Sequence, residues 1–191
     1  MHRGRLEAFS DGVIAILITI MVLELKVPRR ADLAGLLPLY PVFLSYALSF
    51  IYLGIYWSNH HHMLQLVDRV NGKILWANLH LLFWLSLVPF VTGWMGANGA
   101  APLPTALYGV VLLLAAVAYT ILQTAIIRSQ GPESKLRAAV QGDRKGKLSI
   151  VCYAAAVPLA FGNRWIAIAL YVVVALMWLV PDRRIESTLK T

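Results

Sequence analysis

A carboxylate stands near the head of the first long apolar run of the chain. Asp11 follows Phe9 and Ser10 and precedes the apolar stretch 13–23. A charged side chain inside a membrane costs about 2.5 to 3.5 kcal/mol on insertion scales, so such a residue by default marks a functional site or a built-in polar network. Segment 5–12 is therefore the first place to look for function.

The role of Asp11 depends on the partner that its carboxylate finds. Asp11 lies about 140° around an ideal helix from Ile16, so the two side chains point in different directions. Candidate partners are Arg5, His80, or the Trp57 and Asn59 pair. Two roles stay open: a structural network with Ser10 that locks the first helix, or direct participation in proton or ion transfer.

A second pattern on the same helix is an apolar stripe with one hydroxyl. Ile16, Thr19, Ile20 and Leu23 follow the 0, 3, 4, 7 spacing that places side chains on one helix face. Such a face packs against other helices, contacts lipid or lines a pore, and spacing alone does not choose among these. Threonine in membrane helices commonly bonds to its own backbone. Glu24, at the outer end, either attracts cations or pairs with Lys26 or Arg29.

Three consecutive histidines, His60, His61 and His62, suggest a metal site at first sight. Consecutive helical residues point about 100° apart, so the three rings do not converge on one ion unaided. We predict no metal and instead expect solvated or partly buried histidines at a helix end. For His80, inside a later apolar run, we expect a bond to another helix.

Composition indicates what kind of molecule carries these residues. Of 191 residues, 59% are hydrophobic and 14% are charged, as in an all-α integral membrane protein with several spanning helices. The net charge of +8 fits basic residues that face lipid head groups rather than nucleic acid. The single cysteine, Cys152, excludes an intrachain disulfide.

Six spanning helices are predicted, in one domain covering 1–191. Their approximate ranges are 6–27, 36–58, 74–95, 103–127, 148–161 and 165–180, with Pro89 kinking the third. With the N-terminus inside, 13 of the 17 basic residues lie in inner segments and four in outer ones. This positive-inside bias predicts that both termini are cytoplasmic. The chain contains none of the TVGYG, P-loop, HExxH or GxSxG patterns, so an enzyme is not expected.

Three stretches carry a resemblance to a known family. They are Arg5-x3-Phe9-Ser10-Asp11 at the head of the first span, the run 54–61 (Gly-Ile-Tyr-Trp-Ser-Asn-His-His), and the stretch 78–90 that ends in Leu-Val-Pro-Phe. The first half of the chain thereby resembles the transmembrane protein 175 family. The second half resembles it only in the number and length of its spans.

The resemblance implies a potassium-permeable channel without cofactors, in which K⁺ is the permeant ion. One six-span repeat is similar to prokaryotic members, which implies a homotetramer in a bacterial or archaeal plasma membrane. The first span would line the pore, with a hydrophobic constriction at Ile16, Ile20 and Leu23 and a hydroxyl layer at Thr19. Modest selectivity for K⁺ over Na⁺ follows from rings without carbonyl ligands. The predicted structural network around the signature comprises Arg5, Phe9, Ser10, Asp11, Trp57, Asn59, His60, His61 and His80.

Two rival interpretations remain at this stage. A proton channel or proton-coupled transporter would use Asp11 and His80 as a relay. A membrane-embedded enzyme or assembly scaffold would instead use the run His60, His61 and His62.

Overall fold

The computed structural model describes residues 3–67, 69–131, 134, 136–137 and 143–179 of the 191. Within these ranges the chain is helical and contains no strand. The helices are α1 Arg3–Ile20, η1 Met21–Glu24, α2 Leu33–Leu36, η2 Leu37–Leu39, α3 Tyr40–Gln65, α4 Gly72–Ser86, α5 Val88–Ala97, α6 Pro102–Gln130, α8 Arg144–Gly162 and α9 Arg164–Leu179.

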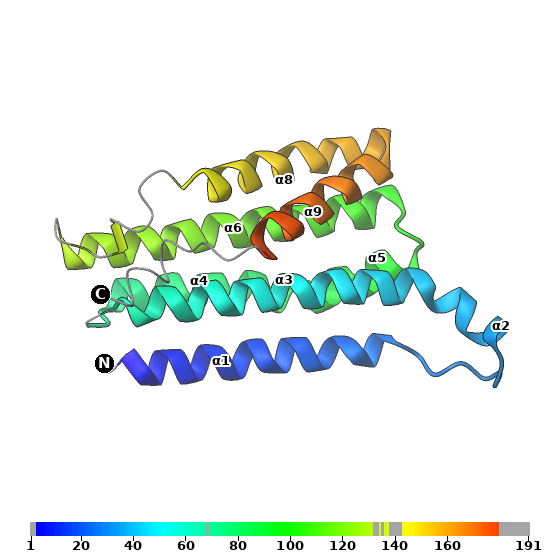
Figure 1. Cartoon of the computed structure of the whole chain (residues 1–191), viewed down its shortest axis with the longest axis horizontal. Helices are drawn as coiled ribbons and strands as arrows, with labels where there is room; N and C mark the ends of the chain where they lie inside the picture. The colour runs from blue at the N-terminus through cyan, green and yellow to red at the C-terminus, as the bar shows by residue number, and fades with distance from the viewer. Residues whose placement is uncertain (1–2, 68, 132–133, 135, 138–142, 180–191) are drawn as a thin grey trace.

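Four helical segments are long and apolar enough to cross a membrane. They are Arg3–Glu24, Leu33–Gln65, Gly72–Ala97 and Pro102–Gln130, and α9 is a shorter apolar helix. The protein is thus an all-α membrane protein, as predicted. Figure 1 shows α1 along one edge of the bundle, α3, α4 and α5 beside it, and α6, α8 and α9 on the far side.

Prolines and short polar caps explain several helix boundaries. The third predicted span is divided at Leu87 into α4 and α5, with Pro89 in the first turn of α5, where its missing N–H does least harm. Asn71 caps α4 by accepting a bond from the Ile74 N–H, 3.0 Å away. Asp143 caps α8 in the same way through the Gly146 N–H, at 2.8 Å.

The second predicted span ends too early at residue 58. The helix α3 continues to Gln65 and contains the whole histidine run. The physical reason is that His60, Met63 and Leu64 are buried, so the last two turns continue the packed face of the helix. The sixth predicted span matches α9 except for Val180, which lies outside the described residues.

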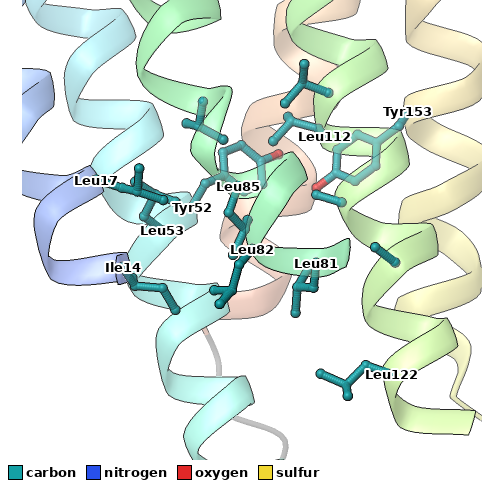
Figure 2. Packing of buried hydrophobic residues seen from close by; sticks show 14 of the residues in the cluster. Ile14, Leu17, Tyr52, Leu53, Leu81, Leu82, Leu85, Leu112, Leu122 and Tyr153 are labelled. Atoms are coloured by element: carbon teal, nitrogen blue, oxygen red, sulfur yellow. The ribbon is translucent and has the colours of Figure 1, made fainter. Parts of the chain in front are cut away.

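One continuous apolar core joins the helices. Ile14 and Leu17 of α1 pack near Leu53 of α3 and Leu82 and Leu85 of α4 (Figure 2). Such burial of large aliphatic side chains supplies dispersion contacts along the whole bundle.

Buried hydroxyls join the helices on the far side of the core. The Tyr52 hydroxyl donates to the Tyr171 carbonyl at 2.6 Å, and the Tyr171 hydroxyl donates to the Thr105 carbonyl at 3.0 Å. Ser49 Oγ lies 2.6 Å from Thr92 Oγ1 and 3.0 Å from the Tyr108 hydroxyl. These bonds tie α3 to α5, α6 and α9.

Candidate ion pathway

The first helix has one buried face and one exposed face. The buried positions of this helix and of η1 recur every three or four residues and pack on α3, α4 and α5: Leu6, Ser10, Ile14, Leu17 and Met21. On an adjoining face of the helix, the exposed fractions are 52% for Phe9, 57% for Ile16, 43% for Ile20 and 75% for Leu23. The predicted stripe is therefore the face of α1 and η1 that this protomer leaves uncovered.

Thr19 belongs to the same exposed face. Its hydroxyl donates back to the helix, with carbonyl oxygens of Ile16 at 2.9 Å and Ala15 at 3.1 Å. The hydroxyl proton is thereby directed into the helix, as is common for threonine in membrane helices. The lone pairs of Thr19 Oγ1 remain available on the exposed side.

Three contacts clamp the head of α1 to the end of α3. Arg3 donates to the Gln65 carbonyl at 2.8 Å, and Glu7 Oε1 lies 2.9 Å from His61 Nδ1. Trp57 Nε1 donates to Asp11 Oδ1 at 3.0 Å. The positions advance by four on both helices and in opposite directions, which is the register of an antiparallel pair. We call these six residues the α1–α3 clamp.

A second, fully buried chain of bonds joins α1, α3 and α4. His60 Nε2 lies 2.6 Å from Asn78 Oδ1, and Asn78 Nδ2 donates to Ser10 Oγ at 2.9 Å. Ser10 Oγ then donates to the Leu6 carbonyl at 2.8 Å. Because an amide oxygen only accepts, His60 carries its proton on Nε2. We call His60, Asn78 and Ser10 the buried triad.

The tautomer leaves one polar atom of His60 unsatisfied. Within the described part of the chain, His60 Nδ1 is buried and has no hydrogen-bond partner. An orphaned buried acceptor costs free energy, so the two bonds through Asn78 must offset it. The triad is consequently sensitive to any change at Asn78.

Several signature residues lie outside this network. Arg5 and Phe9 are exposed, and Phe9 lies about 20° around the helix from Ile16. Asn59 bonds back to the Ile55 carbonyl at 2.8 Å, and its own carbonyl accepts from Tyr119 at 3.3 Å. Of the candidate partners named for Asp11, Trp57 is the one whose side chain bonds to it.

His80 makes its bond within its own helix. Trp84 Nε1 donates to His80 Nε2 at 2.9 Å, and His80 is exposed. The expected bond from His80 to another helix is thus wrong. In an α-helix, residues four apart are neighbours, which explains why Trp84 reaches the ring first.

The histidine run does not converge on one point. His60 faces Asn78 in the core, whereas His61 faces Glu7 and lies 2.8 Å from Gln65 Nε2. Among the described residues there is no group of three or more His, Cys, Asp or Glu side chains arranged to hold a metal ion.

Sequence reasoning missed four residues of these networks: Arg3, Glu7, Gln65 and Asn78 as a bonded partner. A signal was present, since Arg3, Glu7 and Asp11 follow at intervals of four and so do Trp57, His61 and Gln65. Two such matched polar ladders in adjacent spans favour an antiparallel helix pair.

Glu24, at the C-terminal end of η1, lies against Gly93 of α5. A Cβ atom at position 93 would lie 2.7 Å from Glu24 Oε2, so a larger residue there would displace the end of the flexible Glu24 side chain. Glu24 is nevertheless exposed. Gly93 thus leaves the space that the Glu24 carboxylate occupies beside α5.

Comparisons with known proteins agree on one family. Residues 5–89 match the family model described as endosomal/lysosomal potassium channel TMEM175. A potassium channel of a Chryseobacterium strain is 56% identical over 190 residues, covering 100% of this chain and 99% of that protein. A potassium channel of Streptomyces collinus is 35% identical over 127 residues, covering 62% of each chain.

A solved structure resembles the whole fold. It is the crystal structure of a lysosomal potassium-selective channel TMEM175 homolog from Chamaesiphon minutus, with a TM-score of 0.82 and 28% identity. The match covers 94% of this chain and 97% of that one. The chain therefore belongs to the TMEM175 family of potassium channels, whose permeant ion is K⁺ and whose members are not enzymes.

Proposed function

We propose that four copies of this chain form a potassium-permeable channel in a prokaryotic plasma membrane, with one α1 helix from each copy lining the pore. The observation that carries the proposal is the uncovered apolar face of α1 and η1, where Ile16 is 57% exposed and Leu23 is 75% exposed. That face is left open on a helix whose other side is clamped in place. In a tetramer, four such faces can meet around one shared axis and line a pore.

The proposed constriction is hydrophobic. Rings of Ile16, Ile20 and Leu23 supply no oxygen atoms to replace the hydration shell of an ion, so a narrow ring blocks conduction by dewetting. Opening requires the rings to separate until a largely hydrated ion passes. Arg5 and Phe9 extend the same face toward the N-terminal end of α1.

Thr19 gives the pore its modest preference among cations. Four hydroxyl oxygens, each with its proton directed back into its own helix, present lone pairs toward the axis. Hydroxyls are weaker and fewer than the carbonyl rings of a dedicated potassium filter, so we expect weaker discrimination between K⁺ and Na⁺.

In this proposal the α1–α3 clamp and the buried triad are structural. They fix the rotation of α1 about its own axis, which decides which residues face the pore. Asp11 is engaged by Trp57, and His80 by Trp84, so no observation favours a proton relay through that pair.

The proposed topology has six crossings in one domain, with both termini cytoplasmic. The helices α1, α3, α4 with α5, and α6 supply four, and α8 and α9 supply the other two as a hairpin beside α6 (Figure 1). The excess of basic residues at inner segments supports this orientation.

The test is potassium flux through purified protein in lipid vesicles, with Ile16→Asn as the variant. A polar ring at the constriction attracts water, so conductance rises or selectivity relaxes while the tetramer stays assembled. The control is Ile18→Asn, the same chemical change on the opposite, half-buried side of the helix. Unchanged currents from assembled Ile16→Asn tetramers would show that Ile16 does not form the constriction.

A further inference from the structure

The uncovered surface of α1 extends beyond the proposed pore stripe. Beside that stripe lies a face of small residues, Ala8, Gly12 and Ala15, all exposed in the protomer. Gly12 lies about 40° round the helix from Ile16, so the two faces adjoin. We call these three residues the small face.

No packing within the protomer explains the glycine in the small face. In the described part of the chain, a Cβ atom at position 12 would meet no neighbouring atom within 4 Å. Glycine inside a helix costs about 1 kcal/mol relative to alanine. Small residues in membrane helices are typical of places where another helix approaches closely. The small face therefore indicates a helix contact made outside the protomer.

A face of the opposite character lies on α4. Trp76, His80 and Phe83 are exposed, Trp76 by 75% and Phe83 by 55%. They follow one another at intervals of four and three residues, which are the intervals of the small face. We call these three residues the bulky face.

The two faces lie at the same height along the bundle. Both α1 and α4 run antiparallel to α3, so they run in the same direction (Figure 1). Asn78 Nδ2 donates to Ser10 Oγ at 2.9 Å, which places these two positions side by side. His80 and Gly12 each lie two residues further along and are level with each other. The same count makes every member of the bulky face level with the corresponding member of the small face.

Within one protomer the two faces point away from each other. Residues of the small face lie about 140 to 160° round α1 from Ser10, and residues of the bulky face lie at the same angles round α4 from Asn78. Because Ser10 and Asn78 face each other, one protomer cannot bring its own two faces together. Rotation about an axis parallel to the helices preserves height, so the small face of one copy can meet the bulky face of the next. Contacts of this head-to-tail kind close into rings.

His80 favours protein rather than lipid as the cover of the bulky face. Trp84 Nε1 donates to His80 Nε2, so the neutral ring carries its proton on Nδ1. Among the described residues, no acceptor bonds to that proton. A donor left unbonded in lipid costs free energy. The backbone of α1 is open at Gly12, where no side chain covers it, and its carbonyl oxygens can accept such a bond.

We propose that the small face of each copy receives the bulky face of the next copy around the ring, with His80 packed against Gly12 and Phe83 against Ala15. The inference rests on the proposed tetramer and names its partner as a second copy of this chain. The stripe at Ile16 stays free on the adjoining side of α1, so neither contact face lines the pore.

The test is oxidative cross-linking of the full-length chain in membrane vesicles, in a Cys152→Ser background. The pair Ala15→Cys with Phe83→Cys should form disulfides between copies and give a ladder of bands that ends at the tetramer. Positions 15 and 83 face away from each other in the protomer, so the bond cannot form within one copy. Absence of a ladder, or a ladder that stops at the dimer, would overturn the proposal.

A mismatched pair is the control for register. Ala15→Cys with Trp76→Cys moves one cysteine by seven residues, about 10 Å along α4, whereas a disulfide needs Cα atoms within about 7 Å. We expect no ladder from this pair. Equal ladders from the two pairs would overturn the proposed register. Dimers from Ala15→Cys alone would show that two small faces meet each other, which would also overturn the proposal.

A steric test uses the same substitution at two exposed alanines. Ala15→Leu fills the small face and should lower the assembled fraction severalfold, whereas Ala155→Leu, on the exposed side of α8, should leave it unchanged. Light scattering of the purified protein measures assembly, and thermal unfolding confirms that both variants fold. Equal assembly of the two variants would overturn the proposal.

The outcomes separate this interface from the proposed function. A ladder from Ala15→Cys with Phe83→Cys that ends at another number of copies would support the interface and overturn the tetramer. A tetramer ladder, together with currents that Ile16→Asn leaves unchanged, would support the interface and overturn the proposed constriction.

Discussion

The two sides of α3 are held by different chemistry. Toward α1, the contacts use ionisable or amide groups, as in Glu7 with His61 and Asp11 with Trp57. Toward α6 and α9, the contacts use neutral hydroxyls: Tyr52 donates to the Tyr171 carbonyl of α9, and Ser49 Oγ lies 3.0 Å from the Tyr108 hydroxyl of α6.

The difference reflects how much surface each partner helix can bury. The far side packs closely enough that a Cβ at Gly109 would lie 2.1 Å from the Tyr171 hydroxyl oxygen. The helix α1 keeps one face uncovered and so has fewer apolar contacts with which to fix its rotation. Directional polar bonds instead fix the rotation of α1 about its own axis, since they tolerate little change in angle.

The largest expected loss on the α1 side comes from Asn78→Leu in the buried triad. The change leaves the His60 Nε2 proton without an acceptor and removes the donor to Ser10, so we expect about 3 kcal/mol of destabilisation. Thermal unfolding of the purified protein in detergent measures it. Asn98→Leu, at an exposed helix end, is the matched control with little effect. Equal stability of the two variants would show that the triad does not hold the helices.

A smaller effect is expected for Asp11→Ala in the α1–α3 clamp. Losing a hydrogen bond to a half-buried carboxylate should cost about 1.5 kcal/mol and lower the yield of assembled protein. Single-channel conductance of the assembled fraction should stay at the unaltered level. Normal assembly with altered permeation would instead give Asp11 a direct role in conduction.

On the α6 and α9 side, Tyr52→Phe should have the smallest effect. The Tyr171 carbonyl loses one of its donors while the ring stays packed, so we expect about 1 kcal/mol of destabilisation and no change in ion flux. Thermal unfolding and vesicle flux together check this. A larger loss than for Asp11→Ala would reverse the proposed contrast between the two sides of α3.

Helical spacing alone predicted the stripe at Ile16, Ile20 and Leu23, because a fixed angle per residue decides which side chains share a face. It did not decide whether that face is buried. The partner of Asp11 stayed open among Arg5, His80 and the Trp57 and Asn59 pair, since the choice depends on the register between α1 and α3. That register follows from the matched ladders at Glu7 and His61, which sequence reasoning overlooked.

The histidine run shows a different limit. Spacing predicted that neighbouring rings point apart, and His60 and His61 do face different partners, Asn78 and Glu7. The burial of His60 and the extension of α3 to Gln65 depend on packing against α4. No local sequence pattern in the histidine run predicts that packing.

The most direct test of a pore lined by α1 is block of the channel by a cationic thiol reagent. In a Cys152→Ser background, Leu23→Cys is compared with Trp76→Cys, because both native side chains are 75% exposed in the protomer. The reagent is applied to both sides of a planar bilayer while potassium current is recorded. If α1 lines the pore, the current falls in Leu23→Cys and persists in Trp76→Cys. Persistence of the current in Leu23→Cys, with modification verified by mass, would contradict a pore lined by α1.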